Sequence, residues 1–380
     1  MKKATNSKNK GKISKLLPVM QEHLGKSMNL ARIKLMTLLL EALVKVQTVN
    51  LVRLANAMPT AVDKESNMRR LQRFLAGYAL NLDLIARMIF SLLPAKHDLV
   101  LTMDRTNWKY GKTDINVLLL GVTYKNVAFP LLFRLLPKRG NSNTAERVEI
   151  IGRFVRLFGK DCIDCLVADR EFVGQQWTGY LNNMGIRYYL RIRQNFWIRK
   201  PGSGKQIRVS WLFNGLKPGQ QTFLHKPYLL KGEYVYLAGA MLKNSDDVPE
   251  LQILICYNRP QEAVDTYKLR WQIETMNRCL KTAGFNLEDT HLTQLERIER
   301  LLAVVCIAVV WAYLVGDHRD QCVKLIRILN NGRRTMSVVR YGLMEIESVL
   351  QRPQYKDKSN IFNFLSCTYD PNKYADKTAK

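Results

Sequence analysis

The chain has 380 residues, a hydrophobic fraction of 47% and a formal net charge of +27, with an isoelectric point of about 9.9. These values exclude a largely disordered protein and allow two or three domains with a sizeable core. The positive balance indicates a polyanionic partner, nucleic acid first and an anionic membrane surface second. Seven scattered cysteines without a recognisable secretory signal predict a reducing compartment, which we expect to be the cytoplasm.

Amphipathic helices are predicted in the first quarter of the chain. Residues 1–15 are polar and lysine-rich, so we expect a disordered basic arm there. One of the helices that follow carries Arg69, Arg70 and Arg73. Short helices with such a cluster suit a helix-turn-helix-like DNA-binding module, and a plain bundle with an exposed basic face is the alternative. The predicted helices span residues 35–46, 51–58, 67–75 and 82–93, within a domain of residues 1–94.

From His97 the pattern alternates between strands and helices. The order β-β-β-α-β-α-β predicts an α/β fold, with a mixed sheet and helices on its faces. Residues 193–260 are strand-rich and aromatic, and we interpret them as an all-β insertion into this core. The predicted strands are 99–103, 115–124, 127–136, 163–168 and 188–192, and the predicted helices are 144–158 and 174–184.

The last third of the chain is predicted to be helical. A helix is expected from residue 262 to 283, followed by mostly helical structure to residue 351 and a polar tail over 352–380. The longest apolar run, residues 301–315, is 15 residues long. A membrane span needs about 20 apolar residues, so this run predicts a buried helix and no membrane partner.

A set of polar residues recurs within the predicted helix of residues 262–283. Tyr267, Arg270, Glu274 and Lys281 follow one another at offsets of 0, 3, 7 and 14. On a helix of 3.6 residues per turn these offsets fall within roughly 60° of arc. One face therefore presents a carboxylate between two cations and a phenol, which suits a metal ion held against a phosphodiester. An ordinary amphipathic surface helix is the alternative if the set stood alone.

Two aspartates upstream extend this pattern. Asp104 follows the predicted strand 99–103, and Asp169 follows the predicted strand 163–168. If these strands are neighbours, both carboxylates meet and Glu274 can close the site. Three close carboxylates require divalent cations, and an all-oxygen ligand set favours Mg²⁺ or Mn²⁺ over zinc. For each aspartate taken alone, a turn or helix-capping role is the more common one.

These residues resemble the signature of a known family. Asp104 in Leu-Thr-Met-Asp-Arg-Thr, Asp169 in Val-Ala-Asp-Arg-Glu-Phe and Glu274 in Arg-Trp-Gln-Ile-Glu are similar to the three catalytic blocks of bacterial insertion-sequence transposases of the DDE type. The Tyr-Arg-Glu-Lys helix resembles that of the insertion-sequence-four family. The resemblance implies an RNase H-like core of residues 95–192 and 261–290, interrupted by the β insertion and followed by a helical region at 291–351.

The resemblance also implies an activity and its partners. Two Mg²⁺ ions, which Mn²⁺ can replace, would be held by Asp104, Asp169 and Glu274, while Tyr267, Arg270 and Lys281 would contact DNA phosphates. The expected reaction is cleavage at the inverted-repeat ends of an element and transfer of the 3′-hydroxyl ends into target DNA. A homodimer on paired ends, associated with the bacterial nucleoid, is expected. A non-catalytic repressor that binds these ends, or a stand-alone RNase H-like nuclease, remains the alternative.

The aromatic residue that stacks a flipped base in some of these transposases is not assigned from the sequence. Trp197 and Trp211 lie farther from Glu274 than that position usually does, whereas Tyr234 is nearer. Trp271 matches the Arg-Trp pair of the resemblance, and we expect it to pack in the core rather than to stack on a base.

Overall fold

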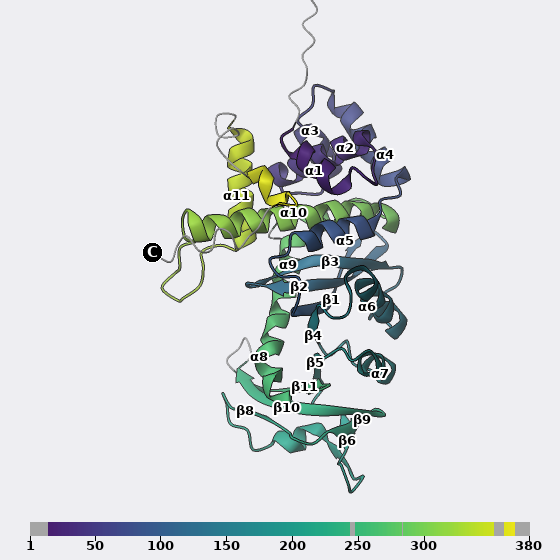
Figure 1. Ribbon diagram of the computed structural model, residues 1–380, viewed down its shortest axis with the longest axis vertical. Coiled ribbons are helices and arrows are strands. Elements are labelled where there is room, and N and C mark those ends of the chain that lie inside the picture. The colour runs from purple at the N-terminus through teal and green to yellow at the C-terminus, as the bar shows by residue number, and fades with distance from the viewer. Residues whose placement is uncertain (1–13, 244–247, 283, 353–360, 369–380) are drawn as a thin grey trace, which may run out of the picture. The chain divides into compact units, whose positions relative to one another are not determined.

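The computed structural model describes residues 14–243, 248–282, 284–352 and 361–368 (Figure 1). The predicted basic arm and polar tail fall mostly outside these ranges. The chain divides into two compact units. A helical unit contains residues 1–94 and 279–380, and an α/β unit contains residues 95–278.

Polar caps begin the helices of the helical unit. Asn29 accepts a hydrogen bond from the backbone N–H of Arg32 at the start of α2, and Asp63 accepts one from Ser66 at the start of α4. Such caps satisfy amide groups that have no partner inside the helix. Both helices begin earlier than predicted. The predicted start was placed at the first apolar residue of the repeat, whereas the helix begins directly after its capping residue. The unit contains α1 (Leu16–Leu24), α2 (Leu30–Val46), α3 (Leu51–Ala57), α4 (Lys64–Gly77), α5 (Leu82–Ser91), α10 (Leu295–Cys322) and α11 (Val338–Gln351).

The long helix α10 is the core of this unit. It packs against α2, α4, α5 and α11, so helices from both ends of the chain share one core rather than forming the two separate regions predicted. Glycines allow the closest of these contacts: a Cβ at Gly342 of α11 would lie 1.8 Å from the carbonyl oxygen of Ala312. The prediction of a buried helix over residues 301–315 is confirmed, since every residue of that run is buried.

The argument that the apolar run is too short for a membrane span is wrong for the helix as a whole. α10 has 28 residues and is long and apolar enough to cross a membrane, but 89% of its most apolar window is buried inside the protein. The helix exceeds the apolar run because polar turns extend it at both ends. Two bent helix pairs, α2 with α3 and α4 with α5, reach the same threshold only if each pair is counted as one span.

The first half of the α/β unit contains five strands and two helices. Strands β1, β2 and β3 form an antiparallel meander, and β4 and β5 join β1 in parallel, giving the order β3-β2-β1-β4-β5. The mixed sheet with helices that the sequence predicts is thus observed. The elements are β1 (Leu99–Tyr110), β2 (Thr113–Tyr124), β3 (Val127–Leu136), α6 (Thr144–Phe158), β4 (Ile163–Ala168), α7 (Gln175–Met184) and β5 (Tyr188–Ile192).

Local chemistry explains several of these boundaries. Lys125 and Asn126 both have positive φ, 39° and 74°, which is the backbone of the tight turns that join antiparallel strands such as β2 and β3. Asn143 and Glu146 form a reciprocal capping box at the start of α6. The predicted boundaries of α6, β4 and β5 agree with those observed.

The strand-rich segment continues the same sheet. β11 pairs antiparallel with β5, placing Ile253 opposite Ile192, and β10 pairs with β11. The sheet therefore has 11 strands, and the expected all-β insertion is not a separate body. β5 is buried, and a buried strand edge needs a hydrogen-bonding partner. The strands are β6 (Trp197–Arg199), β7 (Gln206–Arg208), β8 (Gln221–Phe223), β9 (Tyr228–Leu230), β10 (Glu233–Lys243) and β11 (Pro249–Cys256).

Helices cover both faces of this sheet. Within the α/β unit, α6 and α7 lie on one face, and α8 (Ala263–Tyr267) and α9 (Trp271–Leu280) on the other (Figure 1). Tyr267 and Val264 of α8 pack into an apolar cluster with Val167, Tyr189 and Leu254 from three strands. The core thus fixes α8 directly beneath β4, the strand that leads to Asp169.

Candidate active site

Asp104 lies inside β1 rather than at a strand end as predicted. β1 continues beyond it to Tyr110, because this part of the strand forms a hairpin with β2. The parallel pairing with β4, however, stops where Met103 is opposite Ala168. Asp104 is therefore the first residue of β1 beyond that pairing, and the next residue after β4 is Asp169. The register brings the two aspartates to the same edge.

A tight turn holds the carboxylate of Asp169. Its Oδ1 accepts the backbone N–H of Glu171 at 2.9 Å, and its carbonyl accepts the N–H of Phe172 at 3.0 Å. The turn role that is usual for an aspartate after a strand is thus present. It orients the side chain and leaves the placement beside Asp104 intact.

Glu274 comes from a helix that is interrupted. The predicted single helix of residues 262–283 is observed as α8, a 3₁₀ turn η3 (Lys268–Arg270) and α9. The turn η3 packs against β1 and β4, so tertiary contacts tighten the backbone where the periodicity suggested a regular helix. Glu274 lies in the first turn of α9, and its Oε1 accepts a hydrogen bond from Arg270 Nη2 at 2.6 Å.

Asp169 and Glu274 act electrostatically on Asp104. The pKa of Asp104 is raised from 3.8 to about 6. Burial is the largest cause, and the negative charges of Asp169 and Glu274 act in the same direction. The backbone N–H of Arg105 and the guanidinium of Arg270 oppose the rise. The predicted convergence of three carboxylates thus has an electrostatic counterpart at Asp104.

The chemistry of these side chains suits a hard divalent cation. The ligand atoms are carboxylate oxygens, and a cation would relieve the repulsion that raises the pKa of Asp104. In the part of the chain that the structure describes, no three Asp, Glu, His or Cys side chains are already gathered around one metal position. One reason is visible: Arg270 holds Glu274 in an ion pair in which their side chains are 15% and 32% exposed.

Gly121 of β2 packs closely against the neighbouring strand β3. A Cβ at this position would lie 3.0 Å from the carbonyl oxygen of Phe129 and 3.1 Å from the Cβ of Ala128. The same Cβ would lie 3.7 Å from the sulfur of Met276 on α9, which is an ordinary contact distance, and Met276 is fully buried. The helix that carries Glu274 therefore packs directly on β2, with room for a Cβ but not for a larger side chain.

A buried ion pair ties the two aspartate segments together. Arg105, the residue after Asp104, donates from Nε to both carboxylate oxygens of Glu171 at 3.1 and 3.2 Å. The two side chains are only 16% and 14% exposed. Glu171 also accepts the backbone N–H and the hydroxyl of Ser142. Sequence reasoning weighed Glu171 only as another candidate acid, since nothing local indicates its partner.

Two other acids of the α/β unit form ion pairs away from Asp104. Asp114 pairs with Arg139 at 2.5 Å, and Asp164 pairs with Arg187 at 2.9 Å. Neither is among the groups whose charge acts on Asp104, whereas Asp169 and Glu274 both are.

The part of the chain that contains these acids matches a known protein family. Residues 97–311 match the family described as transposase DDE domain. The chain belongs to this family. The matched range includes Asp104, Asp169 and Glu274.

The comparisons with solved structures and with curated proteins add little to this assignment. This transposase is similar to a piggyBac transposase, solved by cryo-EM as a synaptic complex with hairpin DNA, at 11% identity. The similarity covers 92% of this chain and 83% of that one, with a TM-score of 0.46. No curated protein shows significant similarity to the sequence. The family assignment therefore rests on the matched domain.

Two aromatic residues of the transposase depart from the sequence-based expectation. Tyr267 was expected on the exposed charged face, but it is only 5% exposed and belongs to the apolar cluster beneath β4. Burial is the largest cause that raises the pKa of its phenol to about 12. Trp271 was expected in the core, but it is 57% exposed. The break at η3 explains both, because it rotates α9 relative to α8.

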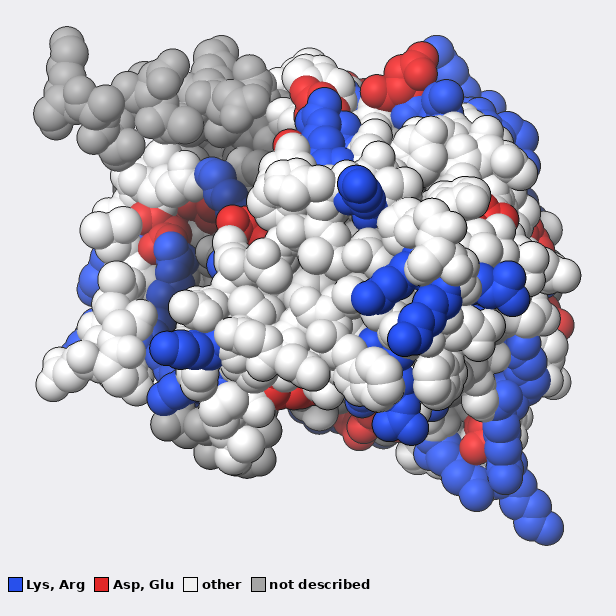
Figure 2. Space-filling view, turned by 90° about the horizontal axis from the view of Figure 1, so that it is seen from below, with Lys and Arg blue, Asp and Glu red and all other residues white. Residues whose placement is uncertain are grey.

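A pocket rich in cations lies beside Arg270, the partner of Glu274, in the α/β unit. It has a volume of about 420 Å³ and is lined by Arg191, Lys243, Lys268 and Arg270, together with the acid Glu250, which pairs with Arg191. Residues 193–243 contain nine Lys and Arg and one acid, Glu233. Figure 2 shows Lys and Arg side chains scattered over one face of the molecule, with smaller groups of Asp and Glu. An excess of cations of this kind suits a polyanion.

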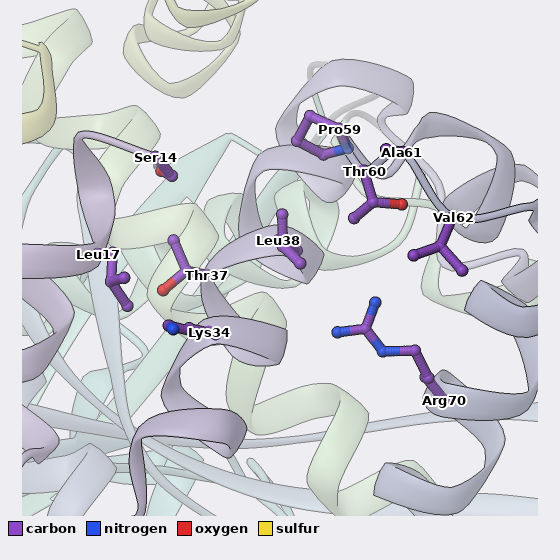
Figure 3. Close-up of a pocket in the computed structure, with 10 residues that line it drawn as sticks. All are labelled: Ser14, Leu17, Lys34, Thr37, Leu38, Pro59, Thr60, Ala61, Val62 and Arg70. Atoms are coloured by element: carbon purple, nitrogen blue, oxygen red, sulfur yellow. The ribbon is translucent and has the colours of Figure 1, made fainter. Parts of the chain in front are cut away.

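The predicted arginines of the helical unit lie on α4. Arg69 and Arg73 are exposed, and Arg70 is half-buried, with Nη1 donating to Asn67 Oδ1 at 3.3 Å. Arg70 also points into a pocket of about 280 Å³, toward residues of the α3–α4 loop, as Figure 3 shows. A second pocket, of about 560 Å³, is lined by Arg32, Arg70 and Arg73. These cations line concave surface, which no residue pattern in the sequence could indicate.

Lys281 lies just beyond the last residue of α9, in the helical unit. Its Nζ pairs with Glu288 Oε1 at 2.9 Å. The expected alignment of Lys281 with Tyr267 on one continuous helical face is not observed, because the helix is interrupted between them. Its proposed contact with DNA stays a prediction.

Proposed function

We propose that this transposase cleaves DNA at the inverted-repeat ends of an insertion sequence and joins the 3′-hydroxyl ends to target DNA, as members of the insertion-sequence-four family do. The observation that carries the proposal is the electrostatic coupling of Asp104 to both Asp169 and Glu274. A pure DNA-binding protein gains nothing from burying an aspartate beside two other acids, since each addition raises the cost of its charge.

The proposed reaction needs a divalent cation, for which Asp104, Asp169 and Glu274 would be the protein ligands. Two Mg²⁺ ions, or Mn²⁺ in their place, would activate the attacking hydroxyl or water and stabilise the leaving oxygen. Arg270 then has a second partner available, because a DNA phosphate can replace Glu274 in its ion pair. When DNA binds, this exchange would leave Glu274 free to bind the cation.

DNA is the proposed partner of the basic surfaces. The terminal repeats would follow the cations around the pocket beside Arg270, and the arginines Arg69, Arg70 and Arg73 would contact phosphates elsewhere on the duplex. Tyr267 and Lys281 are proposed to contact phosphates at the same DNA end. The protein is proposed to act in the nucleoid as a homodimer that holds two paired ends.

Cleavage of a labelled duplex tests this function. The purified full chain is incubated with Mg²⁺ and a duplex that contains the inverted repeat bordering its gene. Wild-type protein should nick at the repeat end, and Asp104→Asn, Asp169→Asn and Glu274→Gln should each lower the rate by at least about 10³-fold while retaining binding. Asp164→Asn is the matched control, since Asp164 lies on β4 but pairs with Arg187.

The alternatives give different results in the same assay. Binding of the ends without cleavage by wild-type protein would indicate a repressor. Cleavage of duplexes irrespective of the repeat would indicate a general nuclease. Normal nicking by Asp104→Asn would refute the assignment of the site.

A further inference from the structure

A fourth polar side chain joins the acids of the α/β unit. Asn277 lies three residues after Glu274 on α9, so the two side chains are neighbours on one helical face. The amide Nδ2 of Asn277 donates a hydrogen bond to Asp104 Oδ2 at 2.8 Å. This contact joins α9 to β1 across 173 residues of sequence. The predicted motif of Tyr267, Arg270, Glu274 and Lys281 does not include Asn277.

The other half of the same amide lacks a partner. Asn277 Oδ1 is buried and accepts no hydrogen bond from the described part of the chain. A buried acceptor without a donor is unfavourable, and native structures rarely keep one without a reason. The nitrogen of the same amide group contacts Asp104, so the unpaired oxygen belongs to a side chain that is already held at this carboxylate. A hydrated cation at Asp104 would bring hydrogen-bond donors near this side chain, because Mg²⁺ keeps several of its waters when bound.

The hydrogen bond from Asn277 joins two elements of the α/β unit. Asp104 lies on the strand β1 and its donor lies on the helix α9, so the contact restricts the direction in which the carboxylate points. A neutral amide fixes the orientation of a carboxylate without adding charge. A lysine or arginine at the same place would orient it too, but it would repel a cation.

We propose that Asn277 is a positioning residue of the active site. Through Nδ2 it holds the carboxylate of Asp104 in one orientation, and its Oδ1 would be available to a water molecule of a bound cation. This inference rests on the proposed metal-dependent function. Asn277 acts through Asp104 and takes no part in the bonds that break or form.

Mn²⁺ binding to the full chain without DNA tests the proposal. Free Mn²⁺ is measured by electron paramagnetic resonance during titration of wild-type protein, Asn277→Leu, Asp104→Asn and Asn182→Leu. Leucine has nearly the shape of asparagine and lacks its polar atoms. Asn182 is the matched control, because its Nδ2 also donates to a carboxylate, Glu233, at 2.8 Å within the same unit. Melting temperature, DNA affinity and nicking rate are recorded for each variant.

The expected result separates positioning from folding. Asn277→Leu should raise the Mn²⁺ dissociation constant roughly tenfold and lower the nicking rate to a similar degree, with DNA affinity unchanged. Asn182→Leu should bind Mn²⁺ like the wild type even though it melts lower. If Asn277→Leu binds Mn²⁺ as tightly as the wild type while Asp104→Asn does not, the role of Asn277 is refuted and the proposed function stands. If wild-type protein neither binds Mn²⁺ nor nicks, the proposed function itself is refuted.

Discussion

Asp104→Asn should stabilise the metal-free protein while abolishing cleavage. The pKa of Asp104 is raised from 3.8 to about 6, mainly by burial and then by the charges of Asp169 and Glu274. At 1.36 kcal/mol per pH unit, this rise corresponds to about 3 kcal/mol of unfavourable free energy for the ionised side chain at neutral pH. Asparagine removes the charge but still loses hydration on burial, so a net gain of about 2 kcal/mol is expected.

The gain should depend on pH with a definite sign. Below about pH 4 the carboxyl is protonated in both the folded and unfolded states and carries no penalty. Between pH 4 and 6 the native state retains a proton that the unfolded chain has lost, so the stability of wild-type protein falls as pH rises. Above the folded pKa of about 6 the penalty is constant. About half of the penalty, roughly 1.6 kcal/mol, is present at pH 5, and the cost of burying asparagine does not change with pH, so the net gain of Asp104→Asn should fall from about 2 kcal/mol at pH 8 to below 1 kcal/mol at pH 5.

Thermal unfolding in EDTA measures this effect. A gain of about 2 kcal/mol corresponds to about 4–8 °C in melting temperature for a unit of this size. Hydrogen exchange at the amides of β1 and β4 assigns the change to the α/β unit. Asp164→Asn serves as the control, and it should be destabilised because it loses its ion pair with Arg187. An equal gain at pH 5 and pH 8, or none at pH 8, would show that the acids do not act on Asp104 as described.

Three further changes test other parts of the site. Glu171→Gln breaks the buried ion pair with Arg105, so the free energy of unfolding measured with denaturant should fall by about 3 kcal/mol and cleavage should slow. A fall below about 1 kcal/mol would show that this ion pair does not hold the two segments together. Gly121→Val places a Cβ against the carbonyl of Phe129 and further methyl groups against Met276 of α9, so it should slow cleavage without changing DNA affinity in a filter-binding assay; a normal rate would show that the packing of α9 on β2 does not position Glu274. Arg270→Ala should lower the slope of log affinity against log salt by about one, and an unchanged slope would count against a phosphate contact.

Much of the α/β framework could be predicted from local signals. The boundaries of α6, β4 and β5 follow from apolar runs bounded by turn residues, and these signals lie within a few residues of the elements they define. β1 was predicted too short, because its second half is held by the hairpin with β2 and not by burial on both faces. The interruption at η3 was missed because packing against β1 and β4, rather than local propensity, sets it.

The candidate site was selected from residue type and strand order. A helix motif that follows two aspartates placed after predicted strands points to Asp104, Asp169 and Glu274, whose catalytic role stays a prediction. The contacts of Arg105 and Asn277 could not, since their partners are 66 and 173 residues away. A spacing of three residues from Glu274 was the one local sign of Asn277, and asparagine on a helix face is too common to be selected by it.

The junction between β5 and β11 makes the basic strands inseparable from the catalytic ones. Removing residues 193–256 would take away β11, the strand opposite Ile192, and expose a row of backbone amides and carbonyls along β5. An open edge of this kind recruits other chains, so a shortened variant should aggregate rather than persist as a smaller enzyme. A trimmed version for genome engineering would first need a new partner strand for β5.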